Sequence, residues 1–158
     1  MSSKILTPTT LPAVIRKLKA NRKKIVFTNG TFDILHLGHV DYLQKAKKTG
    51  DVLIVGVNTD RSVKTYKNPN RPINSQNDRI RVLSALECVD YAILFNDPTP
   101  LNLILKVKPD VLVKGSDWAV KEIVGAKEVL SWGGKVKRVP LVSGRSTTRL
   151  IRALKLGH

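Results

Sequence analysis

Short apolar runs alternate with segments of helical spacing along almost the whole chain, and this alternation restricts the fold more than any other feature. The first strand candidate, 23–29, is a short β-branched and aromatic run that ends in a Gly-containing turn, as a buried strand does, and the cycle repeats with strand candidates at 51–58, 91–95, 110–115 and 135–140. Segments with helical spacing separate or follow them: 38–50, 74–87, 99–108, 122–132 and 146–155. Alternating strands and helices form a parallel sheet covered on both faces. We therefore predict a single α/β domain over residues 1–158, with a doubly wound, five-stranded parallel sheet.

Two segments lie outside this regular alternation. The first, residues 1–21, contains a Thr-Leu-Pro start followed by apolar residues on one side, which predicts an amphipathic lead-in helix. The second, residues 64–75, is polar and rich in Asn, Pro and basic residues. Long loops in compact domains often cover or bind a ligand, so we predict a mobile substrate loop there, with a loose surface connection as the alternative.

The composition indicates a globular cytoplasmic protein. Apolar residues make up 42% of the chain, but no uninterrupted apolar stretch approaches the roughly 18 residues needed to cross a bilayer. The N-terminus lacks the charged and apolar segments of a secretion signal. Cys88 is the only cysteine, which excludes an intramolecular disulfide and a thiolate metal cluster. It lies in an apolar pattern and is expected in the core.

The charge points to an acidic partner. Lys and Arg total 28 against 12 Asp and Glu, giving a formal charge of +16, which is enough to attract polyanions over a distance. The chain has three Phe, three Tyr and two Trp, and they do not interleave with the basic residues as a base-stacking surface requires. Phosphorylated metabolites and nucleotides fit this charge, while nucleic acid is not expected as a partner.

The segment TNGTFDILHLGH, residues 28–39, is the strongest local signal. It follows the first of the five predicted strands and enters a helix, and ligands bind at the carboxyl ends of strands in open parallel sheets. Gly30 and Gly38 allow a backbone to approach a phosphate closely, and the helix start offers free N–H groups. This turn is therefore a candidate anion site.

His36 and His39 lie three residues apart across the start of that helix, so both rings can face the anion site. A zinc site would need a third protein ligand such as Asp33, because the only other histidine is His158. Capping of the helix by the two histidines is the structural alternative. We expect no metal to be bound by the protein alone.

Two further segments carry candidate ligand-binding residues. Ser146, Thr147 and Thr148 open the last predicted helix, where hydroxyls and free N–H groups form a second candidate anion site, although an ordinary Ser cap explains them equally. Lys114, with Gly115 and Asp117, follows a strand end on the same edge of the sheet. Lys114 as a plain surface lysine is the alternative.

The H-x-G-H turn preceded by GTFD resembles the nucleotidyltransferase superfamily that includes the cytidylyltransferases and, more distantly, the class I aminoacyl-tRNA synthetases. The synthetase branch is not expected, because the chain is short and lacks a KMSKS-like segment. The segments VNTD, NRPIN, DRIRVLSALE, VKGSDW, IVGAKEVLSWGG and GRSTTRLI extend the likeness over roughly residues 22–156. Together they resemble the D-glycero-D-manno-heptose 1-phosphate adenylyltransferases, which often form the C-terminal half of a bifunctional heptose kinase and adenylyltransferase.

This resemblance implies a Rossmann-like fold and transfer of AMP from ATP to a sugar 1-phosphate, with release of pyrophosphate. The Mg²⁺ ion would be held mainly by ATP, the enzyme would be a homodimer, and the kinase activity would reside on another polypeptide. The implied catalytic residues are His36, His39 and Lys114. The implied nucleotide-binding residues are Thr28, Asn29, Gly30, Thr31, Phe32, Asp33, Gly38, Gly115, Asp117, Ser146, Thr147 and Thr148. The implied sugar phosphate-binding residues are Asn58, Asp60, Lys64, Arg71 and Arg79.

One departure concerns the charge near the last predicted helix. Glycerol-phosphate cytidylyltransferases carry RTEGISTT where this chain has LVSGRSTT, so Leu141 replaces an arginine. Arg145, Arg149 or a lysine would supply the missing charge. A cytidylyltransferase acting on a polyol or amino-alcohol phosphate stays open as an alternative. So do two other classes, a basic nucleic-acid-binding domain and a catalytically inactive regulatory relative.

Overall fold

A single parallel sheet forms the centre of the computed structural model, which describes residues 3–156. Its strand order is β1-β4-β3-β2-β5-β6, and every neighbouring pair is parallel. The strands are β1 (Ile5–Leu6), β2 (Ile25–Gly30), β3 (Val52–Asn58), β4 (Tyr91–Phe95), β5 (Val111–Gly115) and β6 (Lys135–Val139). The predicted doubly wound α/β fold is thus confirmed, and all five predicted strands are present.

The sheet has six strands among the described residues rather than the predicted five. The additional strand, β1, pairs only Ile5 with Ala92 and Leu6 with Ile93 at the edge of the sheet. Two residues are too few for any alternation of apolar and polar side chains to be visible in the sequence.

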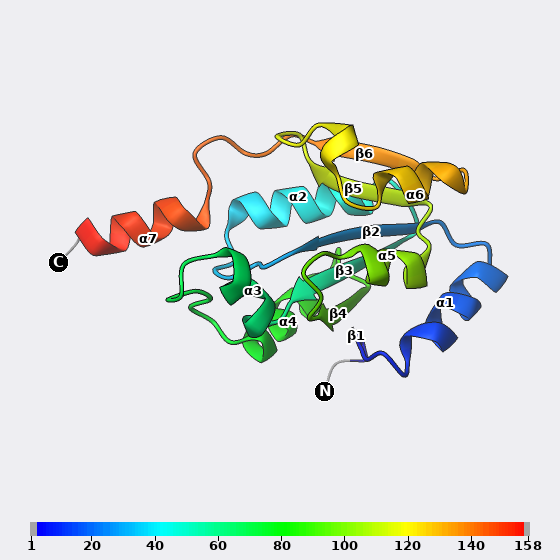
Figure 1. Cartoon of the computed structure of the whole chain (residues 1–158), viewed down its shortest axis with the longest axis horizontal. Helices are drawn as coiled ribbons and strands as arrows, with labels where there is room; N and C mark the ends of the chain where they lie inside the picture. The colour runs from blue at the N-terminus through cyan, green and yellow to red at the C-terminus, as the bar shows by residue number, and fades with distance from the viewer. Residues whose placement is uncertain (1–2, 157–158) are drawn as a thin grey trace.

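Helices cover both faces of the sheet (Figure 1). Strand residues alternate between the two faces, as the two-residue repeat of a strand requires. In β3, Ile54 packs in the layer that includes α1, α5 and α6, whereas Leu53 and Val55 pack in the layer that includes α2 and α4. The helices are α1 (Leu11–Ala20), α2 (Leu37–Lys47), α3 (Asp60–Tyr66), α4 (Gln76–Ser84), α5 (Leu101–Val107), the short 3-10 helix η1 (Val120–Glu122), α6 (Ala126–Ser131) and α7 (Thr147–Leu156).

Three predicted segments differ locally from the structure. The predicted lead-in region 1–21 contains α1, but β1 precedes that helix. The predicted loop 64–75 begins inside α3, whose N-terminus is capped by the Thr59 hydroxyl. The predicted helix 122–132 is broken at Gly125, which adopts a φ of 87° between η1 and α6.

The helix α7 extends away from the body of the molecule, at the end where the carboxyl ends of the strands lie (Figure 1). None of its residues is buried in the described structure. Within residues 3–156, no helix has both the length and the apolar character needed to cross a membrane. The predicted core position of Cys88 is only partly confirmed, since this side chain is half-buried against the α2 and α4 layer.

Candidate active site

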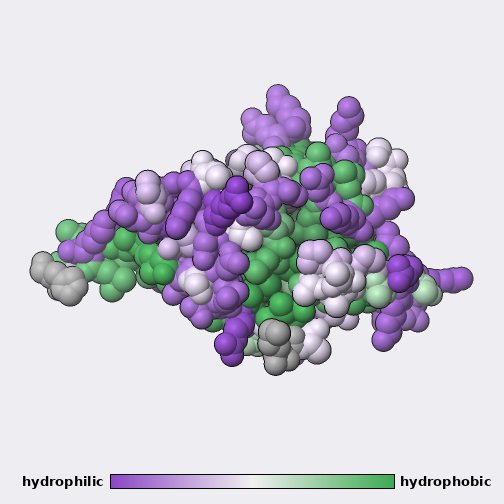
Figure 2. Space-filling model, turned by 60° about the horizontal axis from the view of Figure 1, so that its bottom comes forward, coloured by the Kyte–Doolittle hydropathy of each residue, from purple (hydrophilic) through white to green (hydrophobic). Residues whose placement is uncertain are grey.

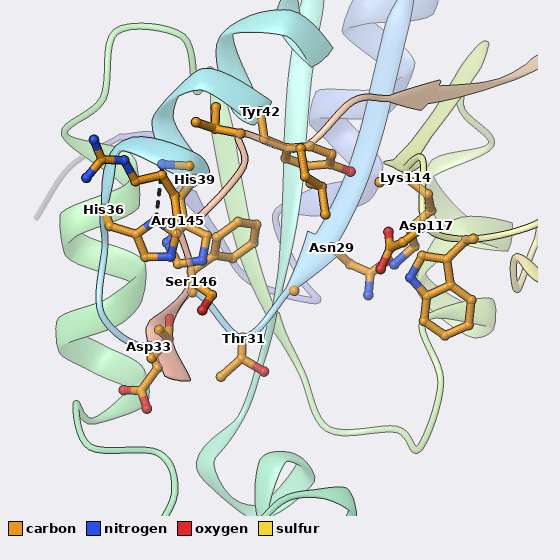
Figure 3. A pocket seen from close by; sticks show the side chains of 18 of the residues that line it. Asn29, Thr31, Asp33, His36, His39, Tyr42, Lys114, Asp117, Arg145 and Ser146 are labelled. Carbon is orange, nitrogen blue, oxygen red and sulfur yellow. Dashed lines mark hydrogen bonds between the residues drawn. The ribbon is translucent and has the colours of Figure 1, made fainter. Parts of the chain in front are cut away.

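A pocket of about 440 Å³ opens where the carboxyl ends of β2 and β5 meet the start of α2 (Figure 3). β2 is the strand from which the chain runs outward in both directions, because β3 lies on one side of it and β5 on the other. Open α/β sheets bind ligands at this switch point. We call this cavity, bounded by the β2–α2 turn, residues 114–118 and residues 141–147, the main pocket.

The rings of His36 and His39 stack against each other in the main pocket, with their centroids 3.9 Å apart and their planes inclined by 27°. His36 is the N-cap of α2, and its Nδ1 accepts a hydrogen bond of 3.0 Å from the Gly38 N–H. Phe32 meets His39 edge-on at 5.3 Å. The predicted convergence of the two histidines is therefore present, and one of them also caps the helix.

Both histidines are held in their neutral forms at neutral pH. Burial is the main cause that lowers the pKa of His39 to about 4, and repulsion from Lys67, and from His36 when that ring is protonated, adds to this effect. Burial, followed by the charge of Arg145, also lowers the pKa of His36. A neutral imidazole donates from only one nitrogen, so a bound anion would be needed to favour the doubly donating imidazolium.

Close packing explains the glycines of the turn. A Cβ on Gly38 would lie 2.9 Å from the His36 ring and 3.1 Å from the Arg145 Cβ. A Cβ on Gly30 would lie 2.9 Å from the ring of Phe32, which itself adopts a φ of 51°. Non-glycine residues seldom adopt this left-handed conformation, and such strain is often found at functional sites. Glycine at both positions lets the histidines and Phe32 pack together.

Lys114, Asp117 and Asn29 form the wall opposite the histidines (Figure 3). Burial lowers the pKa of Lys114 to about 8, against the opposing influence of Asp117. Oδ1 of Asn29 is buried and has no hydrogen-bond partner within residues 3–156. An unsatisfied buried acceptor is costly, so Asn29 is available to receive a donor from a ligand.

Residues 141–147, between β6 and the start of α7, form the third wall of the main pocket. Ser146 and Thr147 line the main pocket, together with Arg145 and Leu141. The guanidinium of Arg149 donates instead to the Gly144 carbonyl, at 2.9 Å. Of the two arginines considered as replacements for the charge lost at Leu141, only Arg145 therefore lines the pocket.

A second cavity of about 380 Å³ adjoins the first, and we call it the side pocket. The two cavities share wall residues from β2, the end of α3 and residues 114–118: Asn29, Gly30, Thr31, Lys67, Lys114 and Trp118. The side pocket also contains Asn58 and Glu122. Two ligands could therefore occupy adjoining positions in contact with the same cations.

Asp33 lines the main pocket, but its carboxylate is already engaged by protein donors. It accepts hydrogen bonds from Arg71 Nε at 3.0 Å and from the N–H groups of Ile73 and Asn74, both at 2.9 Å at the closest. The side chain is 1% exposed. Asp33 therefore fastens residues 71–74 to the β2–α2 turn, and this part of the predicted substrate loop is anchored.

Arg79 is a correction to the predicted substrate-binding set. Its side chain is fully buried and its guanidinium is used internally, so it cannot face a ligand in this structure. It donates to the carbonyls of Thr31 (2.6 Å), Asn58 (2.8 Å) and Asn74 (3.1 Å) and to Asp60 Oδ1 (2.8 Å). Arg79 holds together the ends of β2 and β3 and the start of α4.

Five other predicted residues do not line either pocket. Thr28 is buried beneath the site, where its hydroxyl bonds to the Tyr42 hydroxyl and the Val113 carbonyl. Thr148 and Lys64 are exposed. The remaining two are engaged in ion pairs, Arg71 with Asp33 and Asp60 with Arg79.

The structure also shows pocket residues that the sequence did not single out. Lys67 lines both cavities, and burial and the nearby charge of Arg71 lower its pKa. Trp118 lines both cavities as well, and the Tyr66 hydroxyl bonds to Thr31 at 2.6 Å. The Asn- and Pro-rich loop marked the region of Lys67, but its several basic residues look alike in the sequence.

Similar proteins cover nearly all of this chain. It is 50% identical over 153 residues to the "Bifunctional protein HldE" of Methylobacillus flagellatus, which is 97% of this chain and 31% of that protein. The protein of the same name from Campylobacter fetus is 54% identical over 133 residues, 84% of this chain and 28% of that protein. The chain thus spans about a third of the length of these relatives.

Solved structures agree with this grouping. The "lipopolysaccharide core biosynthesis protein" of Thermoplasma volcanium is 35% identical, with a TM-score of 0.61 over 76% of this chain and 97% of that chain. Pantoate-beta-alanine ligase of Francisella tularensis, 20% identical, has a TM-score of 0.65 over 98% of this chain and 78% of that chain, which shows the shared fold. The "Cytidylyltransferase-like" family model matches residues 27–153. With these likenesses and the His36–His39 turn at the switch point, the chain belongs to the cytidylyltransferase-like nucleotidyltransferases.

Proposed function

We propose that this enzyme transfers AMP from ATP to a sugar 1-phosphate, most specifically D-glycero-D-manno-heptose 1-phosphate, giving ADP-heptose and pyrophosphate. The observation that carries the proposal is the stacked His36–His39 pair in a pocket that shares cationic walls with a second pocket. The choice of sugar rests on the sequence resemblance. The naming of one structural relative as a lipopolysaccharide core biosynthesis protein also supports it.

The nucleotide is assigned to the main pocket. The positive end of the α2 dipole lies at that pocket, and Ser146 and Thr147 add hydroxyl donors. Asn29 offers an acceptor without a partner in the described part of the chain. The sugar phosphate is assigned to the side pocket, next to Lys67 and Lys114.

The reaction requires one bond to form and one to break. A phosphate oxygen of the sugar 1-phosphate attacks the α-phosphorus of ATP, and the bond from that phosphorus to the bridging oxygen breaks as pyrophosphate leaves. The attacking phosphate is already anionic, so no general base is needed. The protein must align two anions that repel each other and stabilise the charge that develops.

The cations of the shared wall are suited to that task. Lys67 and Lys114 both have lowered pKa values because burial disfavours their charged forms. Bound phosphates would reverse this effect and favour protonation. His36 and His39 would then donate to the phosphates in the transition state, with Arg145 at the rim of the pocket.

The donor set fits a magnesium ion carried mainly by nucleotide phosphates. No group of three or more His, Cys, Asp or Glu that could hold a metal occurs within residues 3–156. Of the two carboxylates in the main pocket, Asp33 is engaged by three donors, which leaves Asp117 as a possible protein oxygen ligand. The ion would neutralise the charge of the phosphates when bound.

The test is pyrophosphate release with ATP or CTP and Mg²⁺, in the presence of heptose 1-phosphate, glycerol 3-phosphate or phosphoethanolamine. We expect turnover only with ATP and heptose 1-phosphate. Turnover with CTP and a polyol or amino-alcohol phosphate would overturn the substrate assignment and retain nucleotidyl transfer. No release with any pair, in protein that binds nucleotide, would favour an inactive relative.

A further inference from the structure

A further hollow lies at the opposite end of the strands from the active site. It is formed by the end of α1, the segment before β2 and the starts of β5 and β6, and its volume is about 360 Å³. These starts lie at the end of the molecule away from α7 (Figure 1). β2 alone separates the two regions by about 20 Å, since a strand rises about 3.3 Å per residue. We call this cavity the basic hollow.

Five cations line the basic hollow: Lys19, Arg22, Lys23, Lys24 and Lys135. None of them forms an ion pair in the described part of the chain. Like charges placed together repel and raise the free energy of the site until a counterion binds. Partial burial and the charge of Lys108, which lies outside the lining, lower the pKa of Lys19, while Asp110 opposes this effect.

The carboxylates nearby accept hydrogen bonds from backbone N–H groups. Asp110, the only acid in the described lining of the hollow, accepts a hydrogen bond of 2.8 Å from the Ile25 N–H. Asp51 accepts one of 2.7 Å from the Lys24 N–H. Within residues 3–156, neither carboxylate forms an ion pair with a cation of the hollow.

The turn after α1, which carries Arg22, Lys23 and Lys24, has an arginine at a position where glycine is usual. Arg22 has a φ of 53° directly after α1, and the Lys23 N–H bonds to the Leu18 carbonyl at 3.0 Å. Glycine is preferred at this point of a helix end, and another residue costs roughly 1 kcal/mol in the left-handed conformation. The chain has a cation there instead.

The lining also limits the ligand. The described lining of the hollow has no aromatic side chain, and proteins that bind single-stranded nucleic acid stack the bases on aromatic rings. Figure 2 shows hydrophilic residues at the end of the molecule opposite α7. The chemistry therefore favours a compact anion with several phosphoryl groups and no base to accommodate.

We propose that the basic hollow is a second anion site, which binds pyrophosphate or a short inorganic polyphosphate through Lys19, Arg22, Lys23, Lys24 and Lys135. This site is separate from the nucleotide pocket and does not depend on the proposed sugar substrate. Several cations around one multivalent anion give charge-assisted hydrogen bonds, which are stronger than neutral ones.

The test is a titration of the full chain with tripolyphosphate at about 0.15 M salt, where exposed charges farther apart than about 8 Å are largely screened. The amide NMR signal of Gly133 reports on the basic hollow, and those of Gly38 and Gly115 report on the main pocket. The titration uses the free protein, so that no other phosphate competes with tripolyphosphate. We expect the signal of Gly133 to shift with an affinity of its own, different from that of the Gly38 and Gly115 signals.

Two triple variants with the same change in net charge distinguish binding at the basic hollow from general attraction of the anion to a positively charged protein. Lys23→Gln, Lys24→Gln and Lys135→Gln remove three cations of the hollow. The control variant carries Lys48→Gln, Lys106→Gln and Lys127→Gln, which are exposed lysines that line no described hollow. We expect the first variant to lose about tenfold or more in affinity at the Gly133 signal and the control to lose less than about twofold.

Three outcomes would overturn the proposal: no shift of the Gly133 signal below millimolar tripolyphosphate, equal losses in the two variants, or tighter binding of a DNA or RNA oligonucleotide than of tripolyphosphate at the same signal. The first two would leave the basic hollow as a solvated charged surface. The third would assign it to nucleic acid. Loss of signal dispersion would reveal an unfolded variant, and the single change Lys135→Gln would then replace it.

Discussion

His39 is partly buried in the wall of the main pocket, where its ring stacks on that of His36. We predict that His39→Ala lowers the rate of pyrophosphate release by about a hundred- to a thousandfold, the usual effect of removing one transition-state donor. Circular dichroism would establish that the variant is folded. Turnover near that of the unchanged enzyme would exclude His39 from catalysis.

The lowered pKa of His39 predicts a dependence of stability on pH. The folded state has a pKa of about 4 at this ring, whereas the unfolded state has the ordinary value of 6.5. Between these values the unfolded chain binds more protons, so the free energy of unfolding falls as the pH drops from 6.5 towards 4. Allowing for solvent screening at the partly exposed ring, we expect a loss of roughly 1 to 3 kcal/mol.

Urea unfolding at several pH values would measure this loss. His39→Gln should remove most of the slope in that interval, whereas His36→Gln should retain most of it, because only the pKa of His39 is lowered as far as about 4. Equal slopes in the unchanged protein and in His39→Gln would show that this ring does not control the acid response.

Asp33 is expected to position the loop rather than to contact the nucleotide. Asp33→Asn removes the negative charge, keeps one acceptor oxygen and turns the other acceptor into an NH2 donor that faces N–H donors of the loop. We predict a loss of about 2 to 4 kcal/mol in the free energy of unfolding. Glu87→Gln, at an exposed acid, is the matched control and should change it by less than about 0.5 kcal/mol.

Kinetics would separate positioning from catalysis. If Asp33 acts through residues 71–74, the KM for the sugar phosphate should rise more than kcat falls. A large fall in kcat with an unchanged KM would instead give Asp33 a direct part in the reaction.

At the scale of the element, α7 differs from every other long helix because none of its residues is buried in the described structure. Leu150 is 37% and Leu154 67% exposed, and apolar residues gather at this end of the molecule in Figure 2. We predict that Leu154→Glu changes the free energy of unfolding of the monomer by less than about 0.5 kcal/mol. The buried control is Ile104→Ala on α5, which should cost about 2 to 5 kcal/mol.

Thermal or urea unfolding of the two variants would measure these effects at a protein concentration low enough to disfavour association. A loss above about 1 kcal/mol for Leu154→Glu would contradict the exposed position of α7. The homodimer implied by the resemblance stays a prediction, which sedimentation velocity would check.

For the whole molecule, the formal charge of +16 is the dominant electrostatic feature. Both proposed substrates are anions, so we predict that kcat/KM falls severalfold as salt rises from about 0.05 to 0.3 M, because screening weakens long-range steering. Initial rates at limiting substrate would measure this, with sucrose controls for viscosity. An unchanged kcat/KM would show that the excess charge does not assist substrate capture.

The fold and the convergence of the two histidines could be predicted because local patterns carry them. The strands β2 to β5 lie in short runs rich in apolar residues, and the glycines and histidines of residues 28–39 are close in sequence as well as in space. A strand of two residues has no such pattern, which is why the sequence did not reveal β1.

The roles of the polar residues around the site depended on contacts between distant segments. Asp33 and Arg79 resemble ligand-binding residues in the sequence, yet both are satisfied within the protein. The donors to the Asp33 carboxylate lie 38 to 41 residues away, and the acceptors of Arg79 lie 5 to 48 residues away. The sequence does not distinguish Lys67 from the other basic residues of its loop, whereas the folded structure places it in the lining of both pockets. Periodicity and motifs thus specified the architecture and the β2–α2 turn with its two histidines. Whether a polar group faces a ligand or another part of the protein depends on which distant donors and acceptors the folded chain brings beside it.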